Sequence, residues 1–225
     1  MPRGRLIVLE GPEGAGKTTQ LRLLADRLAG AGYKVLALRE PGGTRLGDSI
    51  RSLLLDTADE MTPAAEALLF MASRAEIVGL RIDPALRDGV IVLMDRFFLS
   101  TYAYQIAGRG LDETQIREAN ALATGGQVPD LTIVIDVPPE AGLARAEARG
   151  SKDRMERADG GFHSRVSSAF SLFATPAWQL DHAECGPIAK VDGTSSPEIV
   201  QNDIISALAQ NLPEDFSMLA AADTR

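Results

Sequence analysis

The residues with the clearest chemistry lie in the segment EGPEGAGKTTQ, residues 10–20. The spacing Gly-x-x-x-x-Gly-Lys-Thr, from Gly11 to Thr18, lets backbone N–H groups turn inward around phosphate oxygens. Lys17 is placed to reach the β- and γ-phosphates, and the Thr18 hydroxyl to bind Mg²⁺. An apolar strand precedes the segment and an amphipathic helix follows it, so the positive end of that helix faces the same anion. The sequence therefore predicts a nucleoside-triphosphate site.

A second polar pair follows the apolar run VIVLMD, Val90–Asp95. A carboxylate at a strand end, Asp95, suits a position beside a metal ion or its waters, and Arg96 could clamp a phosphate through two hydrogen bonds. The alternative is a surface ion pair that caps a helix. A phosphate-binding loop in the same sheet favours the functional interpretation.

Two segments carry arginines that each allow two interpretations. In REPGGTRLGDSIRSLLLD, Arg51 lies on an expected helix near the strand ends, where it either binds a second anion or is simply exposed. In ALLFMASRAEIV, Phe70 and Arg74 share a helix face at i, i+4 spacing. A ring beside a guanidinium can hold a heteroaromatic base, but core packing is the usual explanation for such a phenylalanine.

The segment RGSKDRMERADGGF, residues 149–162, is charged and lacks a continuous apolar face. Its basic residues, with one just before it, are Arg145, Arg149, Lys152, Arg154 and Arg157. One interpretation is a lid whose arginine closes on the transferring phosphoryl group, with glycines as hinges. The other is a solvated helix end with acidic partners at Asp153, Glu156 and Asp159. The residues alone favour neither interpretation over the other.

Short apolar runs separated by helix-length segments predict a parallel sheet wrapped by helices. The expected strands are Leu6–Glu10, Val35–Arg39, Val90–Asp95, Leu131–Val137 and Ile188–Asp192. After the helix that follows the phosphate loop, the expected helices are Leu46–Leu55, Pro63–Leu86, Leu99–Ile106, Thr114–Ala123, Pro139–Arg149, Val166–His182 and Pro197–Gln210. Ligands of such folds gather at the carboxyl ends of the strands, where the first three motifs lie.

Composition limits the function classes. The chain has 225 residues, 45% of them hydrophobic and 24% charged, which is ordinary for a globular protein. A net charge of −8 argues against non-specific nucleic-acid binding through the whole surface. We expect no membrane span and a cytoplasmic location, and we interpret the single cysteine, Cys185, as structurally incidental. Residues 1–211 are expected to form one P-loop domain with a lid at about 145–162, and residues 212–225 a loose tail.

Together, these motifs resemble those of the thymidylate kinase family. The matching segments are EGPEGAGKTTQ, REPGGT with RSLLLD, LLFMASRAE, DRFFLSTYAYQ, PDLTIVIDV and ARGSKDRME. They fall in the family's order and extend from Leu6 to about Gln210. The resemblance implies ATP-dependent phosphorylation of dTMP to dTDP in dTTP synthesis. It also implies a P-loop NTPase fold, an α/β architecture with a central five-stranded parallel sheet, helices on both faces and a mobile lid. A Mg²⁺ cofactor and a homodimer are implied as well.

The resemblance assigns each site residue. Expected ATP contacts are Gly11, Pro12, Glu13, Gly14, Ala15, Gly16, Lys17, Thr18 and Thr19. Expected dTMP contacts are Glu13, Arg51, Phe70, Arg74, Arg96, Ser100, Thr101, Tyr104 and Gln105. Metal contacts are expected at Thr18 and Asp95, and catalytic roles at Lys17, Arg96, Arg149 and Arg154.

Within this set, the resemblance favours stacking of Phe70 on thymine over core packing. It also implies that Arg74 recognises O4 of the base and that Gln105 lies at the far edge of the base. It also gives Glu13 a purpose in a phosphate-binding loop. The backbone N–H of Glu13 serves ATP, while its carboxylate accepts a hydrogen bond from the 3′-hydroxyl of dTMP.

The family has two arrangements of its catalytic arginine, in the P-loop or in the lid. No arginine occurs between Gly11 and Lys17, so this chain resembles the lid type, which is common in bacteria. Arg149 and Arg154 are the candidates, and we favour Arg154. Tyr102 is bulkier than the small or polar residue expected there, which predicts a narrower pocket near the sugar.

Two other functions compete with this assignment. An adenylate or uridylate kinase shares the fold, but Phe70 with Arg74 and Gln105 suits a pyrimidine that has a keto group at O4. A P-loop switch protein would hydrolyse nucleotide without an acceptor. The second anion clamp and the charged lid favour a kinase over such a switch.

Overall fold

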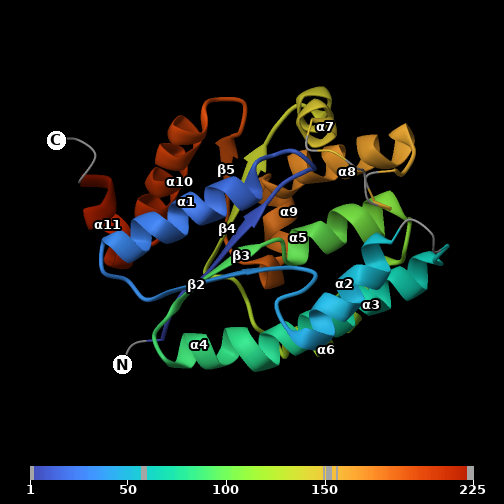
Figure 1. Ribbon diagram of the computed structural model, residues 1–225, viewed down its shortest axis with the longest axis horizontal. Coiled ribbons are helices and arrows are strands. Elements are labelled where there is room, and N and C mark those ends of the chain that lie inside the picture. Colours follow the sequence, from blue (N-terminus) through green and yellow to red (C-terminus); the bar gives the residue numbers. More distant parts are fainter. Residues whose placement is uncertain (1–2, 57–59, 149, 151–153, 156, 222–225) are drawn as a thin grey trace.

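A computed structural model describes residues 3–56, 60–148, 150, 154–155 and 157–221. Its centre is a five-stranded, fully parallel sheet in the order β2-β3-β1-β4-β5 (Figure 1). The strands are β1 (Leu6–Glu10), β2 (Val35–Arg39), β3 (Ile91–Asp95), β4 (Leu131–Asp136) and β5 (Ile188–Asp192). The predicted five-stranded parallel sheet is therefore confirmed.

The strands read as continuous apolar runs because helices cover both faces of the sheet. Successive side chains point to opposite faces, and β1 shows this directly. Leu6 and Val8 pack in one hydrophobic cluster, and Ile7 and Leu9 in another. All five residues of β1 are buried.

The helical segments alternate with the strands along the chain (Figure 1). In the first half they are α1 (Lys17–Gly30), α2 (Arg45–Leu55), α3 (Pro63–Ile77), the π-helical η1 (Val78–Ile82), α4 (Asp83–Arg87), α5 (Phe98–Thr101) and the π-helical η2 (Tyr102–Gly108). In the second half they are α6 (Glu113–Thr124), α7 (Pro139–Glu147), α8 (Gly160–Phe173), α9 (Pro176–Asp181), the 3-10 turn η3 (Ala183–Cys185), α10 (Pro197–Asn211) and α11 (Pro213–Ala221).

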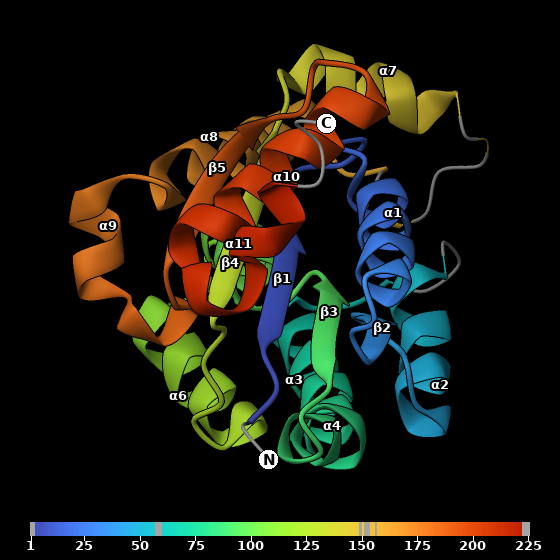
Figure 2. The ribbon, with the colours of Figure 1, turned by 90° about the vertical axis from the view of Figure 1, so that its left-hand side faces the viewer.

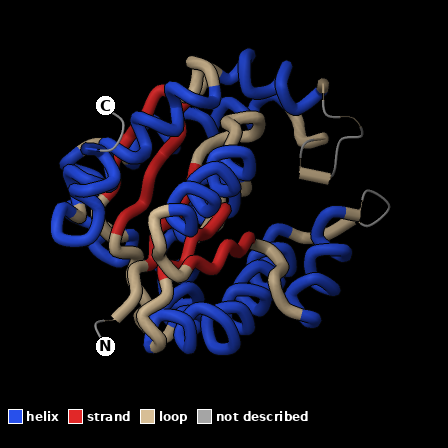
Figure 3. The backbone as a smooth tube through the Cα atoms, turned by 60° about the vertical axis from the view of Figure 1, so that its left-hand side comes forward, coloured by secondary structure: helices blue, strands red, loops and turns tan. Residues whose placement is uncertain are grey.

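Two groups of helices form the outer layers. The cluster around Ile7 and Leu9 takes its other side chains mainly from α1, α10 and α11. The cluster around Leu6 and Val8 takes them mainly from α3, η1, η2 and α8. Figures 2 and 3 show the strands enclosed between these layers.

Two expected helices differ from prediction in a physically clear way. The segment predicted as one helix over Pro63–Leu86 is helical throughout, but η1 interrupts it with a wider π turn. The segment predicted as Val166–His182 is two helices, because Pro176 lacks the N–H that would continue α8 and instead starts α9. α8 begins already at Gly160, where the Asp159 carboxylate accepts from the Phe162 N–H at 3.0 Å. The helix therefore begins inside the range expected for the lid.

The prediction of a loose C-terminal tail is wrong for Pro213–Ala221, which form α11. The Phe216 side chain is fully buried and lies 5.7 Å from the Tyr33 ring, centroid to centroid. The Arg5 side chain donates to the Asp215 carboxylate at 2.7 Å. The aromatic side chain within an acidic stretch was the signal that the sequence prediction did not use.

Two other expectations concern isolated features. Cys185 is fully buried, and burial raises the pKa of its thiol, so its interpretation as a structural residue agrees with its surroundings. None of the helices in the described ranges is long and apolar enough to cross a bilayer.

Candidate active site

A cavity of about 400 Å³ opens at the carboxyl ends of β1 and β3. This is the edge at which open parallel sheets bind ligands, and the volume suits a small organic molecule. Its lining comes from the phosphate loop, the end of β2 and the turn after it, α2, α3, β3 and the segment after it, α7, and Met155 between α7 and α8. The residues that line it are Glu13, Gly14, Gly16, Lys17, Thr18, Thr19, Arg39, Glu40, Pro41, Arg51, Leu55, Phe70, Arg74, Asp95, Arg96, Ser100, Thr101, Tyr104, Gln105, Arg145 and Met155.

The charge of the cavity is opposite to that of the chain. Six of the lining side chains are Lys or Arg, and three are Asp or Glu. The chain as a whole carries −8. A concave site with excess cations in an acidic protein concentrates anions locally. This supports a site for phosphate-bearing ligands.

At one end of the cavity the phosphate loop wraps around its own lysine. The buried Lys17 ammonium donates to the carbonyls of Gly11 and Pro12 at 2.9 and 2.8 Å. Burial, with the charge of Arg96 as the next cause, lowers the pKa of Lys17 to about 8. The lysine is therefore a desolvated cation that an anionic ligand would stabilise.

The loop also packs tightly against the rest of the fold. Gly14 has a φ of 71°, and a Cβ there would lie 1.9 Å from the carbonyl oxygen of Gly142 on α7. Gly16 has a φ of 93° and caps the amino end of α1. Only glycine meets both requirements at Gly14, a left-handed backbone and a close approach. The loop glycines thus fix the backbone conformation of the loop beside the cavity.

Beside the loop, the Thr18 hydroxyl donates to the Asp95 carboxylate at 2.5 Å. Parallel pairing of Leu9 with Asp95 places this carboxylate at the end of β3, next to the loop. Hydroxyl and carboxylate oxygens suit Mg²⁺, which takes one or two protein ligands and completes its shell with phosphates and water. The described residues contain no group of three or more His, Cys, Asp or Glu that would form a protein-only metal cage. The pair therefore fits a Mg²⁺ that arrives with a nucleotide.

Arg96 follows Asp95 and lies at the centre of the cavity's polar network. Its φ of 73° is rare for a residue with a side chain and costs energy, as happens at functional sites. The guanidinium donates to the Glu13 carboxylate at 2.5 Å, to the Ser100 hydroxyl at 3.0 Å and to the Gly11 carbonyl at 3.3 Å. Burial opposes its charge, but the acidic groups around it, Glu13 foremost, together outweigh that effect and raise the pKa of Arg96.

The Glu13 side chain turns toward Arg96 and Tyr104. Its carboxylate accepts from the Tyr104 hydroxyl at 3.0 Å as well as from the Arg96 guanidinium. Burial raises the pKa of Tyr104, so its hydroxyl stays protonated and remains a donor. The carboxylate of Glu13 therefore lies on the side of the cavity that holds residues predicted to bind dTMP, such as Arg96 and Tyr104.

At the other end, α3 presents Phe70 and Arg74 to the cavity, as their spacing predicted. Phe70 is half-buried and belongs to neither hydrophobic cluster, which argues against a core-packing role. Arg74 is fully buried, and its five N–H groups meet acceptors on Glu40, Thr101, Asn120 and the Phe97 carbonyl. A ligand that contacts Arg74 must therefore share or replace one of these bonds.

The remaining predicted contacts lie along the same wall. The Arg51 guanidinium donates to the Pro41 carbonyl at 2.9 Å and lines the cavity from α2. Ser100 and Thr101 line it from α5, and Gln105 from η2. Of the residues predicted to bind ATP, Gly11, Pro12 and Ala15 belong to the loop but do not line the cavity.

The structure describes one of the two candidate lid arginines. Arg149 lies outside the described residues. Arg154 does not line the cavity: its guanidinium lies 2.8 Å from the Glu66 carboxylate and donates to the Leu54 carbonyl at 2.9 Å. Arg145 does line the cavity, and it donates to the Gly193 carbonyl at 2.8 Å.

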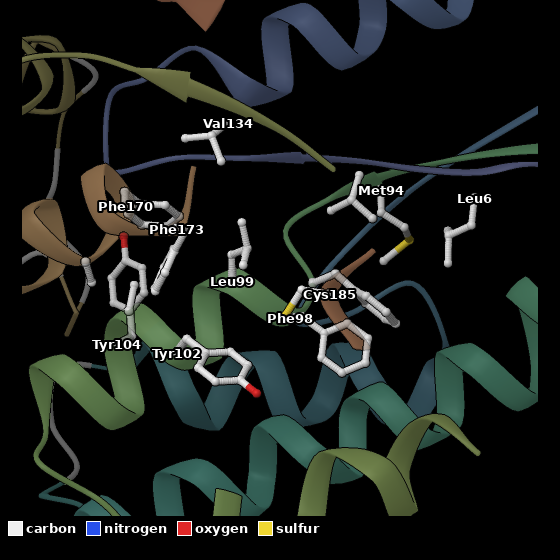
Figure 4. Close-up of a cluster of buried hydrophobic side chains, with 14 of the residues drawn as sticks. Leu6, Met94, Phe98, Leu99, Tyr102, Tyr104, Val134, Phe170, Phe173 and Cys185 are labelled. Atoms are coloured by element: carbon white, nitrogen blue, oxygen red, sulfur yellow. The ribbon is translucent and has the colours of Figure 1, made fainter. Parts of the chain in front are cut away.

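The prediction that Tyr102 narrows the pocket is wrong. Its ring packs against Phe173, Trp178 and His182, and its hydroxyl donates to Glu184. Figure 4 shows the rings of Tyr102 and Tyr104 with their hydroxyl groups pointing in different directions. On the helical turns of this segment, two residues of separation place them on different faces. Tyr102 thus belongs to the core, which explains its bulk.

Two buried carboxylates were missed by the sequence reasoning. Glu10, at the end of β1, accepts from the N–H groups of Phe97 and Ser100 at 2.7 and 3.0 Å, and so fixes the segment after β3. Glu66 lies on α3, one turn before Phe70, and contacts Gln105 behind the cavity wall. Their signal was an acidic residue at a strand end and an acidic residue at helical spacing from Phe70 and Arg74.

Comparison with known proteins agrees with this geometry. The sequence model of the family described as thymidylate kinase matches residues 9–203. A thymidylate kinase from Deinococcus radiodurans is 45% identical over 210 residues, which cover 93% of this chain and 98% of that protein. One from Thermomicrobium roseum is 49% identical over 208 residues, which cover 91% of this chain and 94% of that protein. The chain therefore belongs to the thymidylate kinase family.

Proposed function

We propose that this chain transfers the γ-phosphoryl group of ATP to dTMP and forms dTDP, a step of dTTP synthesis. The observation that carries the proposal is one cavity whose lining contains the phosphate loop, Phe70 and Arg96, with Arg96 hydrogen-bonded to the loop. Membership of the thymidylate kinase family supports it.

On the donor side, the backbone N–H groups of the loop bind the phosphates of ATP. Lys17 gains its full charge when these phosphates approach, because they offset the desolvation that lowers its pKa. Thr18 and Asp95 are the residues that would hold Mg²⁺. When bound, Mg²⁺ neutralises charge on the β- and γ-phosphates.

On the acceptor side, Phe70 stacks on the thymine ring, and Arg74 and Gln105 contact the polar edge of the base. Arg51 and Arg96 clamp the 5′-phosphate, and Ser100, Thr101 and Tyr104 complete the wall. The Glu13 carboxylate accepts from the 3′-hydroxyl. An oxygen of the dTMP phosphate then attacks the γ-phosphorus in line, the bond from this phosphorus to the β,γ-bridging oxygen breaks, and ADP leaves. The cations offset the charge that spreads over the equatorial oxygens.

The transition-state arginine is proposed to come from the segment 145–162, with Arg149 and Arg154 as candidates. The contacts of Arg154 add a condition to this proposal. Arg154 reaches the transferring phosphoryl group only after it leaves Glu66 and the Leu54 carbonyl. An arginine finger contributes roughly 10³–10⁵ in rate in related reactions, enough to offset such a rearrangement.

We also propose a cytoplasmic homodimer that has no nucleic-acid or membrane partner. Three leucines on adjoining elements, Leu68 on α3, Leu80 on η1 and Leu122 on α6, are 64, 60 and 87% exposed. An apolar surface of this kind favours contact with a second copy. Light scattering of the purified protein tests this, and replacement of Leu122 by Glu should shift a dimer toward monomer.

The experiment that tests the function is ADP release with a panel of acceptors: dTMP, dUMP, dCMP, AMP and GMP. We expect the highest kcat/KM with dTMP and little ADP without an acceptor. Best activity with AMP would contradict the base assignment and favour an adenylate kinase. Strong turnover without an acceptor would instead indicate a hydrolytic switch.

A further inference from the structure

Glu66 is a fully buried carboxylate that lies just outside the cavity. It occupies α3 four residues before Phe70 and eight before Arg74, so all three side chains share one face of the helix. Phe70 and Arg74 line the cavity, and Glu66 does not. A buried acid in that place needs partners, because an unpaired buried charge is strongly unfavourable.

Four donors from three side chains meet the two oxygens of this carboxylate. Oε1 accepts from Gln105 Nε2 at 3.0 Å and from Arg109 Nε at 3.2 Å. Oε2 lies 2.9 Å from one Arg109 nitrogen and 2.8 Å from Arg154 Nη1. These donors occupy the roughly four lone-pair positions of a carboxylate. Glu66 therefore has no acceptor capacity left for a ligand, and any effect on a ligand passes through its partners.

Among these partners, Gln105 is the one that lines the cavity. An ionised carboxylate cannot donate a hydrogen bond, so the amide nitrogen of Gln105 must be the end that faces Glu66. Within the described part of the chain, the amide oxygen of Gln105 has no hydrogen-bond partner. Glu66, which lies outside the cavity, thus fixes the orientation of the Gln105 amide. The amide oxygen remains available to accept a hydrogen bond from a ligand in the cavity.

We propose that Glu66 is a positioning residue that makes Gln105 present a hydrogen-bond acceptor to the base of the acceptor nucleotide. The inference rests on the proposed function and deepens it. An acceptor at this edge matches the N3–H of a thymine or uracil ring. It opposes cytosine, whose N3 is itself an acceptor. Glu66 therefore contributes to the choice of a 4-keto pyrimidine without touching it.

The surroundings keep Glu66 ionised. Burial raises the pKa of Glu66, but hydrogen bonds from Arg109 and Gln105 and the charge of Arg109 outweigh it and hold the pKa below its usual range. Arg109 is in turn held against the Phe162 ring, with 4.6 Å between its guanidinium carbon and the ring centroid. The carboxylate thus stays an obligate acceptor at neutral pH.

The test is the ratio of kcat/KM for dTMP to that for dCMP in Glu66→Gln. A glutamine at this position can donate to the Gln105 oxygen, so the Gln105 amide is free to turn its donor end into the cavity. We expect kcat/KM for dTMP to fall about tenfold, the value for dCMP not to fall, and KM for ATP to stay unchanged. Glu66→Asp keeps the charge but retracts it from Gln105, and it should lower the ratio in the same direction if Glu66→Gln does not fold.

Two controls separate positioning from general structural support. In a Gln105→Ala background, Glu66→Gln should no longer change the ratio, because the group through which it acts is gone. Arg109→Lys keeps a positive charge beside the carboxylate, which holds it ionised, but removes the paired Arg109 contacts and leaves the Gln105 contact, so it should preserve the ratio.

The proposal is overturned if Glu66→Gln leaves the ratio unchanged, if it lowers the ratio equally without Gln105, or if Arg109→Lys lowers it as much. These results are distinct from failure of the proposed function. That failure would appear in the unaltered chain, as absence of a preference for dTMP in the acceptor panel.

Discussion

Lys17 is buried, and two carbonyl groups of its own loop accept its hydrogen bonds. The motif spacing predicted its place and that of Thr18, because a phosphate loop is a local structure that its own glycines specify. Glu10 and Glu66 were not predicted, because their partners come from segments distant in sequence: Phe97 and Ser100 for Glu10, Gln105 and Arg109 for Glu66. At the scale of single residues, sequence reveals groups that act through local geometry better than groups that act through tertiary contacts.

The lowered pKa of Lys17 predicts proton uptake on nucleotide binding. Above a pH of about 8 the free protein holds this amine largely neutral, whereas bound phosphates favour the charged form. Binding of a non-hydrolysable ATP analogue should therefore take up a proton at pH 9 and much less at pH 7. Calorimetry in buffers of different ionisation heat measures this. Lys17→Arg, whose guanidinium is always charged, should show no uptake, and equal uptake at both pH values would contradict the prediction.

Glu13 supplies a second prediction at this scale. Its carboxylate faces Arg96 and Tyr104, on the acceptor side of the cavity. Glu13→Gln should raise KM for dTMP about tenfold, the usual effect of weakening a charge-assisted hydrogen bond, with a small change in KM for ATP. Steady-state kinetics with each substrate varied in turn measures both. Unchanged affinity for dTMP together with unchanged turnover would refute the role given to Glu13.

Helix α3 shows what periodicity predicts at the scale of elements. Spacing alone placed Phe70 and Arg74 on one face, and both line the cavity. The π-helical segments η1 and η2 were not predicted, because a wider turn leaves almost no mark on the apolar pattern. The prediction for Tyr102 was wrong for the same reason. The side of the helix on which this residue lies follows from the turn geometry and from packing against Trp178.

A substitution on α3 separates ligand stacking from core packing. Phe70→Ala should raise KM for dTMP by about 10- to 100-fold, since loss of a stacked base costs roughly 1–3 kcal/mol. Its thermal midpoint should change little, because Phe70 belongs to neither hydrophobic cluster.

Phe98→Ala is the matched control for this substitution. Phe98 is 3% exposed in the core, and its removal should cost about 3–5 kcal/mol of the free energy of unfolding. A large loss of stability in Phe70→Ala with normal KM would reverse the assignment.

The whole molecule is acidic but surrounds a cavity with a net excess of cations. Short, continuous apolar runs separated by helix-length segments were enough to predict a parallel sheet, because a strand buried on both faces has a recognisable composition. The strand order β2-β3-β1-β4-β5 was not predicted, since it depends on long-range pairing. The tail was misjudged for a related reason: one aromatic residue, Phe216, completes a core cluster that is formed mainly by α1, α10 and the sheet.

The packing of α11 predicts that the C-terminal segment stabilises the fold without taking part in the reaction. Phe216→Ala should lower the free energy of unfolding by about 3–5 kcal/mol, as for a buried phenylalanine. KM for both substrates should be unchanged well below the unfolding temperature. Urea denaturation measures the difference. Leu180→Ala, at a side chain 83% exposed, is the control and should stay within about 0.5 kcal/mol. Equal stability of the two variants would contradict the prediction.

The central claim is that one cavity brings a donor triphosphate and a nucleoside monophosphate together for direct transfer. The most direct measurement follows the γ-phosphoryl group of ³²P-labelled ATP in the presence of dTMP and Mg²⁺. We predict that the label appears in dTDP in equal amount to the ADP formed. Label that appears mainly as inorganic phosphate, with dTMP unchanged, would contradict the claim.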